Sequence, residues 1–356
     1  MTIPQEDIRI ILEAGVQAPS GENAQPWRFI VHRNEISVLN IPERDQSLYS
    51  WGQRASYFAH GTLLENMAVA GRALGYKADI KLFPDHQNMN LTALVTLTAT
   101  LSIEEDRLHR AIPERTTNRK PYKNTSLTPE QRSTILNIGS PFPDAQLFLI
   151  EDIEKRRAVA YAASVNEEIL FGNELMHRFF FDHITWTKKE DEKKSMGFYI
   201  KTLELPILAK LFFRVLKYWR VAKILGRLGF PKRIAHENAK NVYITGAAHG
   251  AIVIHDNQPE AFIQAGRLME RVWLTVTDLG LSLQPLAGVA FLMQGILAGE
   301  TQPFTLTQLA RMTSAYETMN KAYGITNELL VMAFRIGEGG APTARASRLP
   351  PIIRFE

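Results

Sequence analysis

The feature that most constrains this chain is an internal repeat. Residues 61–76 and 266–281 align without gaps and share glycine, leucine, glutamate, leucine and glycine at identical spacing. Both copies carry apolar residues at helical spacing and end in Leu-Gly, a helix stop that tolerates a left-handed backbone. A shorter echo pairs residues 11–15 with 135–139, and an apolar, strand-like run follows each copy. Because the two echoes occur in the same order in both halves, we predict a duplicated unit.

The two halves differ in length. The shorter echo recurs after 124 residues and the longer one after 205, so the second half carries roughly 80 extra residues between about 151 and 245. Periodicity predicts helices at about 5–16, 56–74, 128–138, 152–165, 259–279 and 307–322. It predicts strands at 29–31, 92–98, 148–150, 251–254 and 329–335. This pattern indicates an α+β or mixed α/β fold and lacks the regular βαβ rhythm of a dinucleotide-binding Rossmann unit.

Composition narrows the class of protein. Hydrophobic residues make up 45% and charged residues 22% of the 356 residues, as in folded domains. The formal charge of +4 permits an anionic ligand but does not indicate nucleic acid. The absence of cysteine excludes disulfides and thiolate metal sites, and the nine histidines form no ligand set, so we expect no metal. The N-terminus does not resemble a signal peptide and no apolar run is long enough to span a bilayer, so we expect a cytoplasmic protein.

Four segments outside the repeat have distinctive chemistry. The polar, turn-rich APSGENAQPW at 18–27 joins the first expected helix to the first strand. The RTTNR at 115–119 places two guanidinium groups around hydroxyls, a combination suited to phosphate because arginine stays charged and binds phosphate oxygens bidentately. The tail ARASRLP at 344–350 adds further arginines, and LSLQPLAG at 281–288 directly follows the second copy of the repeated helix. Taken alone, the first two could be an ordinary connection and a solvated basic turn.

Together the four segments resemble the FMN-dependent nitroreductases. Residues 18–27 match the APSxxNxQPW signature that follows the first long helix of that family. The 115–119 segment is similar to the family's Arg-x-Ser-x-Lys/Arg element, which grips the FMN phosphate, with threonine in place of serine. Arg348 matches the arginine of the closing SRLP-like element, whereas Ala346 stands where relatives often have a lysine.

The fourth segment resembles the family's Pro-x-x-Gly turn, whose backbone amides face flavin N5. An amide there tunes the flavin by hydrogen bonding to the nitrogen whose protonation changes on reduction. Ala287 replaces the usual glutamate, which keeps the backbone donor and removes the side chain. The resemblance implies that Arg115, Thr117, Arg119 and Arg348 hold the phosphate, that Ser20, Asn23 and Gln25 contact the ribityl chain or ring, and that Pro285, Ala287 and Gly288 form the turn at N5.

These segments are unevenly distributed between the halves. The 18–27 loop occurs only in the first half, and the phosphate elements and the turn occur only in the second. Ordinary family members are homodimers that build each flavin site from both subunits, so this asymmetry resembles the fused-dimer, Acg-like branch. It implies a nitroreductase-like α+β fold with two half-domains, 1–110 and 111–356, each with a central, mainly antiparallel sheet flanked by helices. It also implies one FMN per chain and a monomer that mimics a dimer.

The extra residues of the second half include a basic amphipathic stretch. Residues 206–234 contain no acid, and cations recur every three or four positions among apolar residues, at Lys210, Arg214, Lys217, Arg220, Lys223 and Arg227. Such a helix can cap a pocket with its apolar side down, or it can lie on an anionic bilayer. We expect the first of these, with a helical lid inserted at about 166–242, and keep membrane contact as the alternative.

The expected activity follows from the resemblance. FMN would take a hydride at N5 from NADH or NADPH and reduce a small electron-poor acceptor such as a nitroaromatic or a quinone. No side chain is expected to act as a catalytic acid or base, because the flavin carries the chemistry. The alternative is a flavin-binding or storage protein whose lid occludes the site and leaves little turnover.

Overall fold

The computed structural model describes residues 3–100, 106–139, 142 and 144–356. The first sheet has the order β11-β1-β2-β4-β3, with strands Trp27–His32 (β1), Glu35–Asn40 (β2), Tyr76–Leu82 (β3), Leu91–Ala99 (β4) and Ile353–Phe355 (β11). The second has the order β5-β8-β10-β9, with strands Ala145–Ile150 (β5), Ala248–Ile254 (β8), Ser282–Pro285 (β9) and Leu329–Gly337 (β10). All neighbours in both sheets are antiparallel except β1 and β11. The fold is α+β with two mainly antiparallel sheets, as the sequence predicts.

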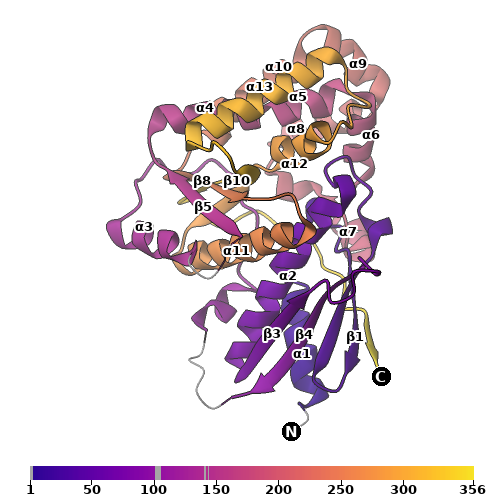
Figure 1. Ribbon diagram of the computed structural model, residues 1–356. Helices are drawn as coiled ribbons and strands as arrows, with labels where there is room; N and C mark the ends of the chain where they lie inside the picture. Colours follow the sequence, from indigo (N-terminus) through magenta and orange to yellow (C-terminus); the bar gives the residue numbers. More distant parts are fainter. Residues whose placement is uncertain (1–2, 101–105, 140–141, 143) are drawn as a thin grey trace.

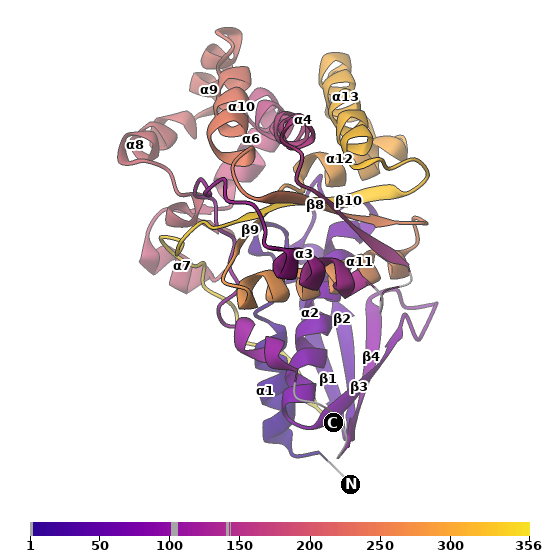
Figure 2. The ribbon, with the colours of Figure 1, turned by 90° about the vertical axis from the view of Figure 1, so that its left-hand side faces the viewer.

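The long helices lie in two layers. Between the sheets lie α2 (Arg54–Ala73) and α11 (Pro259–Asp278), with α3 (Pro129–Leu136) at the side, and α1 (Gln5–Gly15) packs against α2 beside the first sheet (Figures 1 and 2). Above the second sheet lie α4 (Ile153–Ala163), α5 (Val165–Gly172), α12 (Gly288–Leu297) and α13 (Leu306–Tyr323). The second sheet is therefore covered on both faces, and β8 is buried along its whole length. Its side chains alternate, since Ile252 and Ile254 join the core between the sheets while Ala251 and Val253 join the upper core.

The remaining elements belong mainly to the extra residues of the second half. These are α6 (Glu174–Asp182), the short parallel strands β6 (Ile184–Thr185) and β7 (Phe198–Tyr199), α7 (Lys188–Lys194), the 3-10 turn η6 (Ile200–Leu203), α8 (Ile207–Leu216), α9 (Trp219–Arg227), α10 (Phe230–Asn238) and a π-turn at Ala239–Tyr243. Phe171, Phe181 and Phe213 pack together beneath α8. The short helices thus have an aromatic core of their own.

The repeated helices α2 and α11 pack directly against each other between the sheets (Figure 1). Gly61 and Gly266, which hold equivalent positions in the repeat, lie at the crossing. A Cβ atom on Gly61 would lie 2.0 Å from the carbonyl oxygen of Ile263, and one on Gly266 would lie 1.9 Å from that of Phe58. Two backbones can approach this closely only where both residues lack a side chain.

The C-terminal tail returns from the second sheet to the first. After β10 the chain runs without regular structure to β11, which pairs parallel to β1 with Phe29 opposite Ile353. The tail therefore crosses between the sheets and carries residues 338–352 past the helix layer. The predicted division at about residue 110 does not separate the sheets completely, because a strand from the end of the chain completes the first sheet.

The predicted long helices and the predicted strands are all present, and their ends lie within about three residues of the predicted ones. The basic stretch at 206–234 does not form the single amphipathic helix that the sequence predicts. Residues 206–234 form parts of three short helices, because Tyr218 is extended and Gly229 adopts a left-handed φ of 78° ahead of Pro231. The expectation that its apolar side faces down over a pocket is wrong, since Ile207 and Leu208 are 78% and 79% exposed.

Candidate functional site

The loop at 18–27 has a tightly specified backbone. Glu22, Asn23 and Gln25 all have positive φ, at 46°, 58° and 50°. The Ser20 hydroxyl accepts a hydrogen bond of 3.0 Å from the Gln25 amide N–H and closes the loop. Asparagine tolerates this conformation better than most residues, so the polar composition of the loop has a conformational reason in addition to any binding role.

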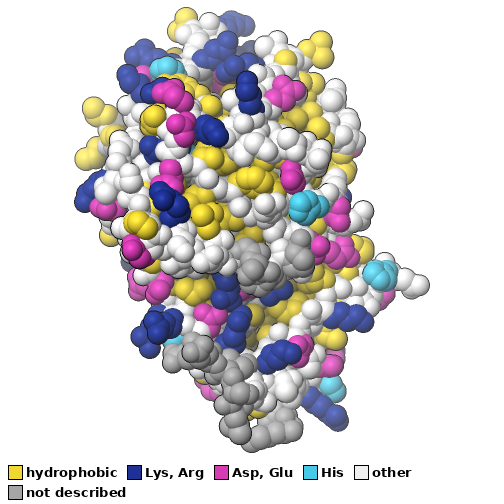
Figure 3. All heavy atoms as spheres, turned by 60° about the vertical axis from the view of Figure 1, so that its left-hand side comes forward, with side chains coloured by type: hydrophobic (Ala, Val, Ile, Leu, Met, Phe, Trp, Pro, Cys, Tyr) yellow, Lys and Arg dark blue, Asp and Glu magenta, His cyan; other side chains and the backbone are white. Residues whose placement is uncertain are grey.

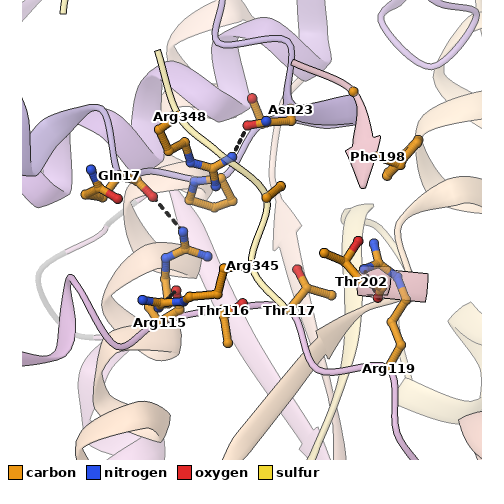
Figure 4. A pocket seen from close by; sticks show the side chains of 14 residues that line it. Gln17, Asn23, Arg115, Thr116, Thr117, Arg119, Phe198, Thr202, Arg345 and Arg348 are labelled. Atoms are coloured by element: carbon orange, nitrogen blue, oxygen red, sulfur yellow. Dashed lines mark hydrogen bonds between the residues drawn. The ribbon is translucent and has the colours of Figure 1, made fainter. Parts of the chain in front are cut away.

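A cavity of about 140 Å3 lies at this loop. Its walls come from the loop, the 115–119 segment, the C-terminal tail and residues between α7 and α8, as Figure 4 shows. The lining residues are Gln17, Pro19, Ser20, Asn23, Arg115, Thr116, Thr117, Arg119, Gly197, Phe198, Thr202, Arg345, Ala346 and Arg348. The fold thus brings together six of the ten residues expected to bind a cofactor, from both halves of the chain: Ser20, Asn23, Arg115, Thr117, Arg119 and Arg348.

Arg115 is the most deeply held of the arginines. Its guanidinium lies over the Trp273 ring, 4.6 Å from the centroid, and donates a 2.6 Å hydrogen bond to the Gln17 carbonyl. Its Nε lies 3.0 Å from Glu270 Oε1 as an ion pair, although the two groups are not aligned as a hydrogen bond. Glu270 is the glutamate of the second copy of the repeat, so the repeat helix α11 supplies the counter-charge behind the cavity.

The other arginines are anchored through backbone carbonyls. Arg119 donates to the Thr202 carbonyl at 3.0 Å, and Arg345 donates to the carbonyls of Pro113 and Arg115. Arg348 donates to the Asn23 side-chain oxygen (Figure 4). Because carbonyl and amide partners orient a guanidinium without neutralising it, these side chains keep their positive charge toward the cavity.

The cavity is electropositive, because the charges of its arginines are only partly balanced by nearby carboxylates. Burial, together with the neighbouring charge of Arg115, lowers the pKa of Arg348 to about 9, although the charge of Glu270 opposes part of this shift. Burial also raises the pKa of Glu270 to about 7, which weakens the one carboxyl group that faces the arginines from α11. A concave site with several guanidinium groups and threonine hydroxyls favours a multiply charged anion such as a phosphate monoester.

A segment of the insert is clasped over the cavity. The Ser195 carbonyl accepts hydrogen bonds from the side-chain amides of Asn23, at 3.3 Å, and Gln25, at 2.6 Å. The Asp191 carboxyl accepts from the backbone N–H and hydroxyl of Ser347, at 2.9 and 2.7 Å. The segment 191–198 is thus tied both to the loop of the first half and to the C-terminal tail.

Gln25 is fully buried and is not among the described residues that line the cavity. Its side-chain oxygen accepts from the Leu349 N–H at 2.9 Å, and its side-chain amide donates to Ser195. In this conformation both ends of the side chain are engaged within the protein. These contacts position the loop, and the direct contact of Gln25 with the ribityl chain or the ring stays a prediction.

The turn at Pro285–Gly288 lies elsewhere. Of the described residues that line the cavity, none comes from this turn. A Cβ atom on Gly288 would lie 2.2 Å from the Asn166 side chain, whose oxygen accepts a hydrogen bond from Tyr49. Thr117 nevertheless connects the two regions, because it forms a parallel bridge with Leu283 of β9. From there the turn is two strand residues away, about 7 Å.

A second cavity of about 270 Å3 shares Gly197 with the first. Its lining includes Glu22, Arg44, Asp45, Phe179, His183 and Met196. Burial, reinforced by the charge of Asp45, raises the pKa of Glu22 to about 8. The segment around Gly197 therefore separates a cationic cavity from one that holds a carboxyl group with a strong tendency to stay protonated.

Several lining residues were not among the expected site residues. Arg345 lies three positions before Arg348 in the same tail motif, so its basic charge was a signal that could have identified it. Gly197, Phe198 and Thr202 come from the insert, for which neither the repeat nor the resemblance offers a template. Their proximity to the arginines depends on the tertiary structure alone.

Within the described residues, no three or more His, Cys, Asp or Glu side chains are grouped so that they could hold a metal ion. Across the same part of the chain, no helix has the length and apolar character needed to cross a membrane.

Comparison with known proteins agrees with the resemblance. Residues 1–47 match the model of the Nitroreductase family. An uncharacterised protein of Mycobacterium tuberculosis, MT1398, is 23% identical over 348 residues, which covers 97% of this chain and 47% of that protein. Rv3131 of the same species, named as an NAD(P)H nitroreductase, is 30% identical over 118 residues, 33% of this chain and 34% of that protein. PigM of Serratia sp., also named as an NAD(P)H nitroreductase, is 23% identical over 285 residues, 76% of this chain and 77% of that protein.

The chain is thus similar to the Nitroreductase family over its N-terminal region and to relatives named as NAD(P)H nitroreductases over parts of its length. It spans less than half the length of the first two relatives, MT1398 and Rv3131, that it matches.

Proposed function

We propose that this protein is an FMN-binding oxidoreductase that uses NADH or NADPH to reduce a small electron-poor acceptor such as a nitroaromatic or a quinone. The observation that carries the proposal is the cluster of arginines and threonines in the cavity at the 18–27 loop, to which Arg115, Arg119 and Arg348 contribute. The similarity of residues 1–47 to the Nitroreductase family and the names of Rv3131 and PigM support the same class of reaction.

The residues present fit the phosphate end of FMN. Thr116 and Thr117 supply hydroxyl donors beside the guanidinium groups. The pKa of Arg348 lies near 9 in part because Arg115 and Arg345 repel its charge, and a dianionic phosphate would relieve that repulsion. We therefore assign Arg115, Thr117, Arg119 and Arg348 to the phosphate and add Arg345 to them.

The flavin, when bound, would accept a hydride from the nicotinamide and pass reducing equivalents to the acceptor. The protein's own residues would bind and orient. Ser20 and Asn23 would face the ribityl chain or the ring, and Gln25 would hold the loop in its left-handed conformation. The bridge between Thr117 and Leu283 favours a ring that extends toward the turn at Pro285–Gly288, where the backbone N–H groups of Ala287 and Gly288 are candidates for the contact with N5.

A single site per chain is part of the proposal. The 18–27 loop belongs to the first half and leads into β1, the phosphate residues belong to the second half, and the tail that carries Arg348 ends as a strand of the first sheet. One complete set of these elements supports one FMN per chain and a monomer that takes the place of a dimer. The two half-domains, 1–110 and 111–356, remain a prediction in this proposal.

The small size of the cavity supports a second candidate function, the storage of flavin. At about 140 Å3 it is smaller than the roughly 300 Å3 at which ligand pockets usually begin. The segment at Ser195–Phe198 lies between it and the second cavity, so withdrawal of this segment would join the two. A protein that opens only to load FMN would store or carry the flavin and turn over slowly.

Two measurements test these functions. The visible spectrum of the purified, FMN-reconstituted chain, with a phosphate analysis, gives the stoichiometry; one FMN per chain supports the single site and two would contradict it. NADH or NADPH oxidation with menadione or a nitrofuran then separates the functions. Turnover supports the oxidoreductase, and bound FMN without turnover supports storage. Failure to retain FMN after reconstitution would overturn both.

A further inference from the structure

The surface of α8 and α9 is a feature of the molecule that the proposed function does not use. The outward side of α8 is apolar, with Ile207 and Leu208 more than three-quarters exposed and Leu211 and Val215 more than half exposed. These positions, i, i+1, i+4 and i+8, lie on one face of the helix. The opposite face packs inward through Phe213 and Leu216, which are buried in the aromatic core.

The exposed side of α9 is cationic. Arg220, Lys223 and Arg227 are exposed at positions i, i+3 and i+7, with the exposed Ile224 among them. Tyr218 and Leu228, which flank the helix, are also exposed. Together the two helices present a row of aliphatic side chains next to a row of arginines and lysines.

The charge of this surface has one sign. Residues 206–234 contain eight lysines and arginines and no aspartate or glutamate. Within the described parts of the chain, no ion pair is formed by any of these eight cations. Figure 3 shows hydrophobic side chains beside concentrated Lys and Arg at the upper left of the molecule, the end where Figure 2 has α8 and α9. The arrangement is unlike that of an ordinary solvated surface, which intersperses both signs and exposes few contiguous aliphatic residues.

We propose that the α8–α9 surface, defined here as residues 207–228, binds peripherally to a membrane rich in anionic phospholipid. Its aliphatic side chains would enter the region between headgroups and acyl chains, and its cations would contact the headgroup phosphates. Charge complementarity selects this occupant, because a surface whose own charged residues are all cations matches an anionic bilayer and repels a second copy of itself. The aromatic core beneath α8 holds the surface in place without any contribution from the flavin site.

This placement has a consequence for the chemistry. Quinones are apolar molecules that dissolve in bilayers, so a membrane-bound oxidoreductase would meet a lipid-soluble acceptor at high local concentration. The segment 191–204, which lines the proposed flavin site and connects directly to α8 through Pro206, would then lie close to the membrane. Membrane binding itself does not depend on the proposed function, since it can be measured without FMN or nicotinamide.

The test is co-flotation of the full chain with vesicles. We expect binding to vesicles of phosphatidylglycerol and phosphatidylcholine, and little binding to phosphatidylcholine alone. Raising the ionic strength from about 0.1 M to about 1 M shortens the Debye length from about 10 Å to about 3 Å and should release most of the protein. Equal binding to both vesicles, or no binding to either, would overturn the proposal.

Two sets of variants locate the binding surface. Arg220→Gln, Lys223→Gln and Arg227→Gln should weaken partitioning about fivefold for each cation removed. Leu208→Ser with Leu211→Ser should weaken it without changing its dependence on salt. The matched controls Arg28→Gln, Lys81→Gln and Lys321→Gln remove three exposed cations elsewhere, and Leu306→Ser removes a leucine that is 86% exposed. The controls should bind as the natural chain does; a loss equal to that of the α8–α9 variants would overturn the assignment.

If the α8–α9 surface binds a second copy of the chain instead of a membrane, the molecular mass in solution will show it. Light scattering after size exclusion should show that the mass of the chain does not change with Leu208→Ser and Leu211→Ser. If the natural chain is a dimer that does not bind vesicles, and these two changes convert it to a monomer, the surface joins two copies of the chain. That result would overturn the membrane proposal.

Discussion

Gly61 and Gly266 face each other where α2 crosses α11, and a Cβ atom added to Gly61 would lie 2.8 Å from the Gly266 Cα. The two glycines hold equivalent positions in the sequence repeat, so the two copies of the repeated helix meet at the same residue. This is the contact expected if the chain arose from a dimer whose central helices paired about a two-fold axis, because a symmetric interface places identical residues opposite each other.

The glycine contact predicts a large loss of stability on a small change. Gly61→Ala or Gly266→Ala would force a methyl group against helix backbone, which cannot move as a side chain can, and should cost about 3 kcal/mol. Denaturant-induced unfolding measures the loss. Gly226→Ala in α9 is the control, because a Cβ there would have no atom within 4 Å. It should be neutral or stabilising by about 0.5–1 kcal/mol, and an equal loss in both variants would contradict the packing argument.

Arg348 offers the cleanest test of the phosphate assignment. Arg348→Ala should weaken FMN binding roughly 10- to 150-fold, since a charge-assisted hydrogen bond contributes about 1.5–3 kcal/mol. Titration of FMN fluorescence gives the Kd. The exposed Arg354→Ala, on the same tail, should leave the Kd unchanged. Arg115 is less suitable, because its removal would leave Glu270 without its buried partner and would destabilise the protein as well.

The clasp over the cavity predicts an effect on the rate of flavin release. Asp191→Ala removes the acceptor of two hydrogen bonds from Ser347 and should speed FMN dissociation by about tenfold. Stopped-flow fluorescence after dilution measures this rate. Glu192→Ala changes the neighbouring, exposed carboxylate and should have no effect. If the two variants release FMN at the same rate, the segment does not hold the site closed.

Glu22 predicts a specific dependence of stability on pH. Its pKa is raised in the folded protein to about 8, from an ordinary value of 4.5, because of burial and the nearby charge of Asp45. The folded state therefore binds a proton that the unfolded state releases, and the associated stability is fully present below about pH 4.5 and lost as the pH rises through 8. Glu22→Gln cannot ionise. It should match the natural chain near pH 4.5 and exceed it at pH 9, by on the order of 2 kcal/mol after allowance for solvent in the adjoining cavity. Unfolding free energies that differ by the same amount at all pH values would show that Glu22 titrates normally.

Periodicity was sufficient for the elements that build the frame of the fold. The helices α2, α11 and α13 and the strands β4, β8 and β10 follow from apolar spacing, because burial of one face or of both leaves a regular pattern along the chain. The strands β2, β3, β9 and β11 and the helix α12 were not predicted. β11 is three residues long and is a strand only because β1 offers it a free edge, so the chain itself carries no signal for it.

The candidate site was likewise predicted from the sequence only in part. Arg115, Thr117, Arg119, Arg348, Ser20 and Asn23 were recognisable as a group from their segments, and they line one cavity. The sequence does not reveal that Ser195 and Asp191 fasten the insert over that cavity, because those contacts join residues more than 150 positions apart through single hydrogen bonds. A side chain and a carbonyl that meet in this way leave no periodic pattern.

The internal repeat in the sequence determined that two equivalent helices exist and that both end at a glycine. Segment chemistry determined that arginines and hydroxyls suited to phosphate lie outside the repeat. Only the tertiary structure decided that Gly61 meets Gly266, that the tail brings Arg348 across to the first sheet, and that the apolar side of α8 faces outward. The reason is that amphipathicity specifies that a helix has two faces, whereas the direction each face takes depends on what the rest of the chain packs against it.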